Sequence, residues 1–428
     1  MKIGIVGLGY VGLPLVIQFA KSGVQVLGID VDDKKVEALN RGESYIKHIP
    51  NSALQAQLKS GHIEATTDYP RVKELDAILI CVPTPLDDKR EPDLTYVLNT
   101  GRSIAPHLTK GTVVVLESTT YPGTTEDELR PILEEGSGLV AGTDFHLAYS
   151  PEREDPGNPD SQVAKIPKVI GGYTPECLEK AKAIYSIAIK KLVPVSCCRV
   201  AEATKLTENI FRSVNIALVN ELKIIYQKMG IDIWEVIEAA KTKPFGYMPF
   251  YPGPGLGGHC IPIDPFYLSW KAKQYGVEAK FIELAGEVNT SMPDYVIERL
   301  EEALHAQGKP LEGSKVLLVG LAYKSDVDDD RESPSYVLIE NLEAKGSVVD
   351  YHDPHVPVIR PSRAYSRFAG RKSITWTAEA MSRYDAAIIA TAHSVVEHVE
   401  LSEWIPCIVD TRNAMASRED IGATITKA

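Results

Sequence analysis

The sequence contains no apolar run near the roughly 18 residues that a helix needs to span a bilayer. Its first residues, MKIGIVGLGYVG, carry one lysine and an apolar stretch broken by glycines. That pattern is typical of an opening strand and differs from a secretory signal peptide. We therefore expect a cytoplasmic protein that has no membrane partner.

The cysteines form no recognisable pattern. None of the six belongs to a C-x-x-C motif or has a histidine at zinc-finger spacing. Three histidines, His352, His355 and His393, also lack a coherent ligand spacing. We expect neither a metal site nor disulfides, which are rare in the cytoplasm.

Positive charge is in deficit, because 46 Lys and Arg stand against 58 Asp and Glu, for a net charge of −12. A general nucleic-acid or anionic-membrane surface needs clustered Lys and Arg. The charge balance argues against both classes of partner. A small anion can still be held by backbone N–H groups and a few local cations.

The length of 428 residues suggests two or three domains, at about 150 residues per domain. We place them at residues 1–200, 201–310 and 311–428. Apolar residues make up 44% and charged residues 24%, which is ordinary for a globular protein with substantial cores.

The first segment follows the dinucleotide-binding pattern of strand, glycine turn, helix, strand and acid. Gly7, Gly9 and Gly12 form G-x-G-x-x-G directly after an apolar strand, and Asp30 closes the next strand, 23 residues after Gly7. A carboxylate at Asp30 would accept hydrogen bonds from the adenosine ribose and repel a 2′-phosphate. The pattern therefore predicts NAD rather than NADP.

Further buried strands are expected within 76–86 and 111–119, each ending in small polar residues where an open parallel sheet places its ligand. Near the other end, a strand within 314–326, a helix over 333–345 and three more strands predict a second βαβ domain. The fold class is therefore α/β, with two Rossmann-like doubly wound domains.

Residues 201–230 read as one long helix that ends at a glycine and joins the two domains. Its apolar positions recur every three or four residues: Leu206, Ile210, Val214, Leu218, Leu222 and Ile225. A helix of this length suits a spine between domains or subunits.

The stretch YPGPGLGGHCIPIDPF, residues 251–266, has four glycines and four prolines in sixteen positions, which neither a helix nor a central strand tolerates. It surrounds Cys260. A single cysteine is otherwise most often an inert small hydrophobe.

Eight motifs in order resemble those of the UDP-sugar 6-dehydrogenases, the family of UDP-glucose dehydrogenase and its UDP-N-acetylhexosamine relatives. They cover nearly the whole chain and read GLGYVG, CVPTP, EST, YSPER, AEATKLTEN, PGPGLGGHCIPID, YKSDVDDDRESP and VDTRN. The resemblance implies an N-terminal NAD domain, a C-terminal UDP-sugar domain and a homodimer formed through the long helix. It also implies oxidation of the C6 alcohol to a carboxylate in two hydride transfers.

The resemblance gives Cys260 a role. Its thiolate would attack the aldehyde, the thiohemiacetal would lose a second hydride, and water would cleave the thioester. Lys205 would raise the thiolate fraction, and Lys205 and Asn209, one helical turn apart, would stabilise an oxyanion at C6. Asp264, Glu152 and a water held by Thr119 stay open as alternatives for the general base.

The remaining site residues are carried over from the same motifs. The implied NAD contacts are Gly7, Gly9, Tyr10, Val11, Gly12, Asp30, Lys35, Val82, Thr84, Ser118, Thr119 and Arg331. The implied UDP-sugar contacts are Glu152, Arg153, Lys205, Asn209, Tyr251, Gly253, Gly257, Lys324 and Arg412. We interpret His259, which precedes Cys260, as a packing or tuning residue rather than as the general base.

Two departures from the UDP-glucose pattern favour UDP-N-acetylglucosamine. Arg153 directly follows Glu152, and residues 241–255 lack the arginine common in UDP-glucose and UDP-N-acetylmannosamine enzymes, where Lys243 could substitute. Phe245, Tyr247 and Arg153 could contact the acetamido group. UDP-N-acetylmannosamine and UDP-glucose are the alternative substrates, and a catalytically silent nucleotide-sugar sensor is the alternative class.

Overall fold

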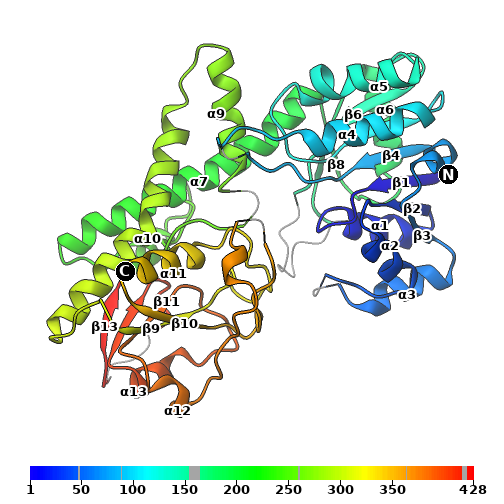
Figure 1. Ribbon diagram of the computed structural model, residues 1–428. Coiled ribbons are helices and arrows are strands. Elements are labelled where there is room, and N and C mark those ends of the chain that lie inside the picture. The colour runs from blue at the N-terminus through cyan, green and yellow to red at the C-terminus, as the bar shows by residue number, and fades with distance from the viewer. Residues whose placement is uncertain (47–48, 88, 154–163, 259–260, 363, 417–421) are drawn as a thin grey trace. The chain divides into compact units, whose positions relative to one another are not determined.

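The structure, a computed structural model, describes residues 1–46, 49–87, 89–153, 164–258, 261–362, 364–416 and 422–428. They form two compact units (Figure 1). Unit 1 consists of Met1–Glu208 and Phe266–Glu278, and unit 2 of Asn209–Pro265 and Ala279–Ala428. The division into three domains stays a prediction.

Unit 1 is built on an eight-stranded sheet in the order β3-β2-β1-β4-β5-β6-β7-β8, in which only the β6–β7 pair is antiparallel among the described strands. Its first six strands have the Rossmann order. The strands are β1 Lys2–Val6, β2 Gln25–Ile29, β3 Ile63–Thr66, β4 Ala77–Ile80, β5 Val113–Leu116, β6 His146–Tyr149, β7 Lys168–Gly172 and β8 Leu192–Val195.

Both faces of this sheet are buried, as an all-apolar strand such as β4 requires. Ala77 and Leu79 pack into one core, and Ile78 and Ile80 into the other. The helices that cover the sheet in Figure 1 are α1 Gly12–Lys21, α2 Asp33–Asn40, α3 Asn51–Lys59, α4 Thr95–Ile104, α5 Arg130–Ser137 and α6 Pro175–Tyr185. Short helical turns lie at Tyr69–Glu74, Ala105–His107 and Thr124–Leu129.

Unit 2 is built on an all-parallel, five-stranded sheet in the order β10-β9-β11-β12-β13. Numbered within the unit, this is the doubly wound order 2-1-3-4-5. The strands are β9 Lys315–Val319, β10 Val348–His352, β11 Ala386–Ile389, β12 Cys407–Asp410 and β13 Thr424–Lys427. The structure thus confirms the second α/β domain and adds β13, which the sequence analysis missed.

The sheet of unit 2 is also covered on both faces, and successive residues of β9 pack alternately into the two hydrophobic cores. Val316 and Leu318 pack with α10 and α11, and Leu317 and Val319 pack on the opposite face. The helices are α8 Ile233–Ala240, α10 Lys280–Ala306, α11 Pro334–Ala344, α12 Ala378–Met381 and α13 Leu401–Trp404, with short turns at Ser366–Phe368 and His398–Glu400.

Helix α7 spans Cys198–Lys228, so the predicted long helix is confirmed; it begins in unit 1 and continues in unit 2. Its apolar positions are not all buried, because Leu218 is 49% and Ile225 45% exposed. The proline-rich stretch is irregular only in part. Helix α9, Asp264–Gln274, starts inside it, since Pro265 lies in the first turn, where no helical N–H is lost.

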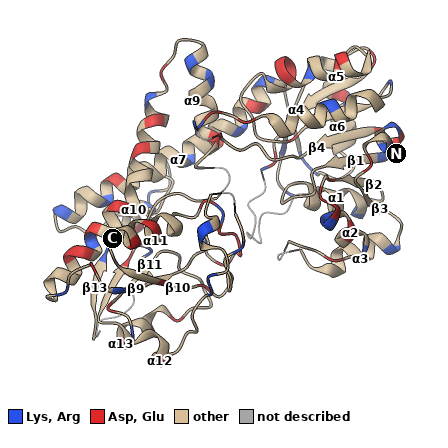
Figure 2. Ribbon diagram, in the orientation of Figure 1, with Lys and Arg blue, Asp and Glu red and all other residues tan. Residues whose placement is uncertain are grey.

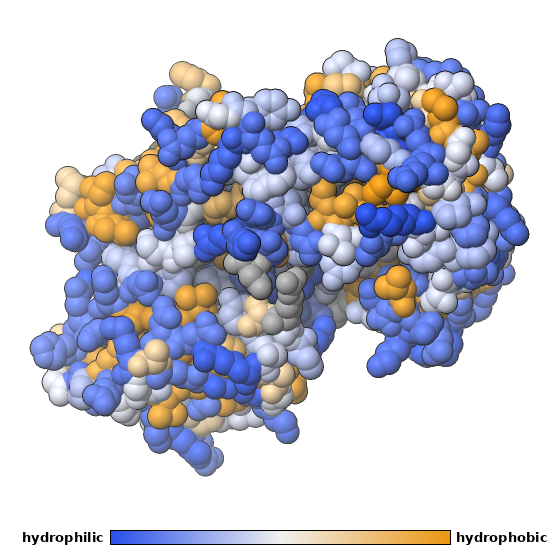
Figure 3. Space-filling model, turned by 45° about the horizontal axis from the view of Figure 1, so that its top comes forward, coloured by the Kyte–Doolittle hydropathy of each residue, from blue (hydrophilic) through white to orange (hydrophobic). Residues whose placement is uncertain are grey.

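Acidic and basic residues are interspersed over both units (Figure 2). Hydrophilic residues cover most of the face shown in Figure 3, where apolar residues form separate groups. Among the described residues, no helix is both long and apolar enough to cross a membrane.

Candidate active site

The turn between β1 and α1 requires glycine at two positions. Gly7 has a φ of 93°, and a Cβ there would lie 2.6 Å from the carbonyl oxygen of Cys81. A Cβ on Gly12 would lie 1.9 Å from the carbonyl oxygen of Gly7. A Cβ on Gly9 would meet nothing within 4 Å, so a ligand can approach the backbone there. The turn has the geometry that a pyrophosphate at a helix N-terminus needs.

Asp30 follows β2 and is 6% exposed. Its Oδ2 accepts the Leu8 N–H at 2.8 Å, its Oδ1 accepts the Asp32 N–H at 3.0 Å, and Lys35 Nζ lies 3.4 Å from Oδ2. A carboxylate has about four acceptor positions, so capacity for ribose hydroxyls remains. The glycine turn and this acid fit NAD, and Tyr10 and Val11 pack beside them against the core.

The other predicted cofactor residues of unit 1 lie after β4 and β5, two neighbouring strands. Ser118 Oγ donates to the Val82 carbonyl at 2.7 Å, which joins the two strand ends. The Thr84 carbonyl accepts the Tyr267 hydroxyl from α9 at 2.7 Å. Thr119 is partly exposed beside the buried Ser118. The sequence analysis missed Tyr267, which fixes the segment around Thr84.

Glu152 lies beside a buried ionic cluster that the sequence analysis also missed. Lys168 Nζ lies 2.7 Å from Glu117 Oε2 and 3.4 Å from Glu152 Oε2, and the Tyr185 hydroxyl donates to Glu117. Burial alone would lower the pKa of Lys168, but the two carboxylates raise it above its ordinary value. The ammonium therefore stays charged and links the buried Glu117 to the more accessible Glu152.

Arg153 makes its hydrogen bonds to groups of unit 1. Its guanidinium makes two hydrogen bonds to the Glu208 carboxylate, at 3.2 and 2.6 Å, and a third to the Pro167 carbonyl at 2.7 Å. Its backbone N–H donates to Glu152 Oε1 at 2.7 Å. These bonds fasten the residue to α7, so its role towards an acetamido group stays a prediction.

Asn209 and Asp264, 55 residues apart in sequence, meet in unit 2. Asn209 Nδ2 donates to Asp264 Oδ2 at 2.5 Å, and both side chains are buried. Lys205 precedes Asn209 by one turn of α7. Cys260 and His259 lie outside the described residues.

The predicted sugar-nucleotide loop is held by a buried amide pair. Asn220 Oδ1 accepts the Gly253 N–H at 3.0 Å, and its Nδ2 donates to Asn289 Oδ1 at 3.0 Å. A Cβ on Gly253 would lie 2.6 Å from an Arg412 guanidinium nitrogen. The structure therefore brings Gly253 and Arg412 together, with glycine required by their close approach.

The other end of this loop contacts the segment after β9. A Cβ on Gly257 would lie 2.7 Å from Tyr323 Cβ, next to Lys324, and the Gly258 N–H donates to the Arg331 carbonyl at 3.2 Å. The Arg331 guanidinium makes two hydrogen bonds to Asp329, at 2.7 and 2.5 Å. Gly257, Lys324 and Arg331 thus belong to one region of unit 2.

Tyr251 stacks on Trp234 of α8 and donates to Glu238 at 3.0 Å. Phe245 and Tyr247, the predicted acetamido contacts, are 72% and 39% exposed. In the single chain they have no apolar enclosure among the described residues.

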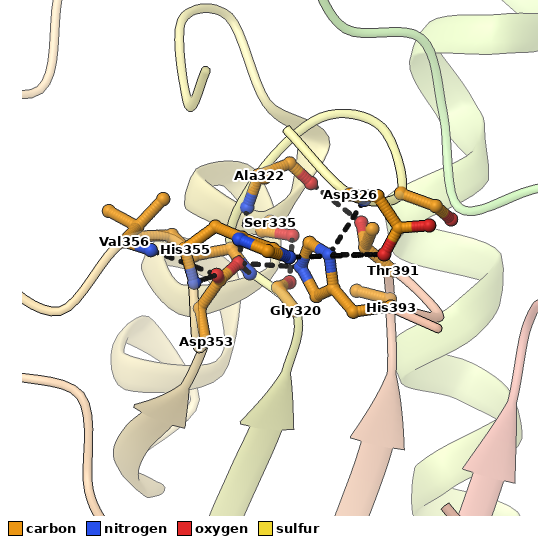
Figure 4. Close-up of polar contacts among 12 residues, drawn as sticks. Gly320, Ala322, Asp326, Ser335, Asp353, His355, Val356, Thr391 and His393 are labelled. Atoms are coloured by element: carbon orange, nitrogen blue, oxygen red, sulfur yellow. Dashed lines mark hydrogen bonds and ion pairs between the residues drawn. The ribbon is translucent and has the colours of Figure 1, made fainter. Parts of the chain in front are cut away.

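The second sheet has its own acid, used differently from Asp30 (Figure 4). Asp353 follows β10 and accepts the N–H groups of Leu321 and Ala322, at 2.7 and 2.8 Å, and a hydrogen bond from His393 Nε2 at 3.0 Å. The His355 and Val356 N–H groups occupy its other oxygen, at 2.7 and 3.0 Å. Five donors and 1% exposure leave Asp353 no capacity for a ribose. Asp353 therefore cannot repeat the ribose contact that Asp30 can offer in unit 1.

Three potential metal ligands lie near this acid: Asp326, His355 and His393 place ligand atoms within 4.8 Å of one another. Both ring nitrogens of His393 are already hydrogen-bonded, because Nδ1 accepts the Asp326 N–H at 3.0 Å and Nε2 contacts Asp353. The arrangement fastens the loop after β9, which carries Lys324.

Three matches cover most of the chain. Residues 1–189 match the UDP-glucose/GDP-mannose dehydrogenase family NAD binding domain. Residues 199–291 match the central domain of that family, and residues 317–417 match its UDP binding domain.

Two relatives that are named as UDP-sugar dehydrogenases align over nearly their full length. A UDP-N-acetyl-D-glucosamine 6-dehydrogenase of Pseudomonas aeruginosa is 37% identical over 92% of this chain and 91% of its own. A UDP-N-acetyl-D-mannosamine dehydrogenase of Escherichia coli (strain K12) is 37% identical over 92% of this chain and 93% of its own.

Solved structures of UDP-sugar dehydrogenases superpose on this chain over nearly its whole length. A UDP-D-ManNAc dehydrogenase from Pyrococcus horikoshii superposes with a TM-score of 0.89 at 31% identity, covering 99% of this chain and 98% of the other. A UDP-glucose dehydrogenase from Pyrobaculum islandicum gives 0.87 at 28% identity, covering 99% and 96%.

Proposed function

The chain belongs to the UDP-glucose/GDP-mannose dehydrogenase family and is an NAD-dependent UDP-sugar dehydrogenase, and from this premise we propose that its substrate is UDP-N-acetylglucosamine. The proposed reaction is a four-electron oxidation of the C6 alcohol to the carboxylate. One relative is named for this sugar and another for UDP-N-acetylmannosamine, so similarity alone leaves both substrates open. The sequence departures around Arg153 and residues 241–255 favour the first.

The proposed chemistry assigns each residue one task. NAD, when bound, supplies the hydride acceptor for each of two oxidations. Lys205 and Asn209 stabilise negative charge on the C6 oxygen as the hydride leaves. The Cys260 thiolate adds to the aldehyde carbon, the adduct loses a second hydride to give a thioester, and water then releases the acid and the thiol.

The observation that supports the proposed chemistry is the hydrogen bond between Asn209 and Asp264. Asp264 follows Cys260 by four residues in sequence, and Asn209 follows Lys205 by four, so this bond ties the two predicted catalytic segments together. A nucleotide-sugar sensor needs neither a nucleophile nor an oxyanion site.

We also propose a homodimer formed through α7. Phe211, Leu218 and Ile225 are spaced by seven residues and are 49%, 49% and 45% exposed, although each is large and apolar. An apolar stripe at this spacing is typical of a helix that packs against another helix. Cytoplasmic location stays a prediction.

The test of the substrate compares kcat/KM for UDP-N-acetylglucosamine, UDP-N-acetylmannosamine and UDP-glucose, with NAD as acceptor. The proposal predicts a clear preference for UDP-N-acetylglucosamine. Preference for either other sugar would reassign the substrate and leave the class unchanged. Binding of UDP-sugars and NAD without turnover of any would support the sensor.

A further inference from the structure

Lys223 is a buried cation whose ammonium group has no partner in the described part of the chain. It lies on α7, five residues before the helix ends, and is 4% exposed. Its Nζ donates no hydrogen bond to any described residue and lies 5.3 Å from the centre of the Tyr295 ring. The Tyr295 hydroxyl is also buried without a hydrogen bond to the described residues. An unpaired buried ammonium is costly, so its retention calls for an explanation.

The charged groups that act on Lys223 do not neutralise it. They are Asp410, the last residue of β12, and Arg412, two residues after it. The titratable phenol of Tyr295 comes from α10. Asp410 already accepts the N–H groups of Arg412 and Met415, at 2.9 and 2.8 Å. No carboxylate of the described chain lies within 4.0 Å of either cation.

Among the described residues, no acceptor takes the terminal N–H groups of the Arg412 guanidinium. Its Nε donates to the Ala390 carbonyl at 2.7 Å. Its terminal nitrogens face Gly253, because a Cβ at that glycine would lie 2.6 Å from one of them. Arg412 is partly exposed, while Lys223 is not. An anion from solvent would therefore meet Arg412 before Lys223.

The position of Lys223 ties it to the predicted sugar-nucleotide loop. Asn220 lies three residues earlier, on the same side of α7, and holds the Gly253 N–H. Lys223, Arg412 and Gly253 therefore share one corner of unit 2. The chain as a whole has a net charge of −12, so two neighbouring cations that have no carboxylate partner among the described residues stand out against their surroundings.

We propose that Lys223 and Arg412 together form an anion site and that the diphosphate of the nucleotide sugar is the anion that occupies it. The inference rests on the proposed function for the identity of the ligand, and Lys223 is the residue it adds to the predicted contacts. A diphosphate supplies the negative charge that the protein lacks at this place.

Burial, with the repulsion from Arg412, lowers the pKa of Lys223 to about 7. Above that pH the free protein holds Lys223 mostly neutral, and a bound diphosphate restores its charge. Binding of UDP at about pH 8 should therefore take up about one proton per site.

The experiment uses the whole protein and three forms of it: wild type, Lys223→Met and, as a matched control, Lys228→Met, at an exposed position of the same helix. Calorimetric titration with UDP in two buffers of different ionisation enthalpy gives both affinity and proton uptake. We expect Lys223→Met to weaken UDP binding by roughly tenfold or more and to abolish the proton uptake. Uridine affinity should stay unchanged, and so should every property of Lys228→Met.

Thermal unfolding without ligand separates this role from a structural one. If the ammonium is kept for an anion, Lys223→Met should unfold at a higher temperature than wild type at about pH 6, because a buried charge is removed. Lower stability together with unchanged UDP affinity would overturn the proposal, as would UDP binding by wild type without proton uptake. If Lys223→Met still oxidises the UDP-sugar with an unchanged KM, the anion site would be wrong and the proposed function would stand. If UDP binding depends on Lys223 but the protein is inactive on every UDP-sugar, the anion site would stand and the proposed function would be wrong.

Discussion

Lys168 forms ion pairs with both the buried Glu117 and the predicted catalytic residue Glu152. Because its ammonium lies 2.7 Å from Glu117 and 3.4 Å from Glu152, we assign it as a positioning residue for Glu152. Its removal leaves two carboxylates without their shared cation, and such carboxylates ionise at higher pH.

The prediction is that Lys168→Met moves the acid limb of the kcat profile upward by roughly one pH unit or more, while Lys168→Arg keeps the wild-type profile. Rate measurements at saturating NAD across the acid range test this. If Lys168→Met lowers kcat but leaves the acid limb of the pH profile unchanged, Lys168 would have a packing role and would not position Glu152.

The Asn209–Asp264 bond gives a second prediction at this scale. Asp264→Ala releases the Asn209 amide, so oxyanion stabilisation at C6 should weaken and kcat should fall by about 100-fold or more. Affinity for NAD should not change, because the glycine turn and Asp30 belong to unit 1. Stopped-flow hydride transfer and NAD titration measure the two effects, with Glu221→Gln, at an exposed position of α7, as the control. Equal rates for both variants would remove Asp264 from the mechanism.

At the scale of elements, Glu202 attaches the N-terminal part of α7 to the turn before α5. Its carboxylate accepts the Gly123 and Thr125 N–H groups at 2.6 and 2.9 Å, and the Thr125 hydroxyl at 2.7 Å. Burial nevertheless raises the pKa of Glu202 from 4.5 to about 7. The folded state therefore binds a proton that the unfolded chain releases between these values.

Because the pKa of Glu202 is higher in the folded than in the unfolded chain, the free energy of unfolding should decrease as the pH rises. The stabilising contribution is complete below pH 4.5 and is lost as the pH rises through about 7, for a total of about 3 kcal/mol. Denaturation curves of wild type and Glu202→Gln across this range should diverge, with wild type losing stability relative to the variant as the pH rises. Parallel curves would show that the carboxyl is ionised throughout.

Helices, strands and turns could be predicted from the sequence where residues close together in the chain determine them. The glycine turn, β1, β2 and α7 follow from the spacing of apolar residues and from the glycines that flank them. β13 was missed because TITK is short, alternating and near the end of the chain, and only its pairing with β12 makes it a strand. The start of α9 was hidden because Pro265, a helix breaker elsewhere, is compatible with a first turn.

Site residues that depend on distant partners were not predictable. Lys168 and Glu117 are 51 residues apart in sequence, and Asp353 and His393 are 40 apart. The residues next to each of them in the sequence therefore do not indicate which partner it contacts. Asp353 follows β10 as Asp30 follows β2, and only its five donors show that it has no capacity left for a ribose. Motifs carried over from a family supply roles, but they do not reveal which side chains already have partners.

At the scale of the whole molecule, the exposed stripe on α7 predicts the assembly state. Leu218→Glu combined with Ile225→Glu should convert a dimer into a monomer, because two charges per chain would be buried in the interface. Light scattering after gel filtration measures the mass, and circular dichroism checks that the chain stays folded. A wild-type monomer, or a dimer that survives both changes, would contradict assembly through α7.

The central claim is a four-electron oxidation completed at Cys260, and the most direct measurement is the amount of NADH formed per UDP-N-acetylglucosamine consumed. The account predicts two NADH per sugar and a carboxylate product for wild type, and loss of turnover to the acid for Cys260→Ser. A ratio of one with an aldehyde product, or an unchanged ratio of two with full turnover in Cys260→Ser, would contradict it.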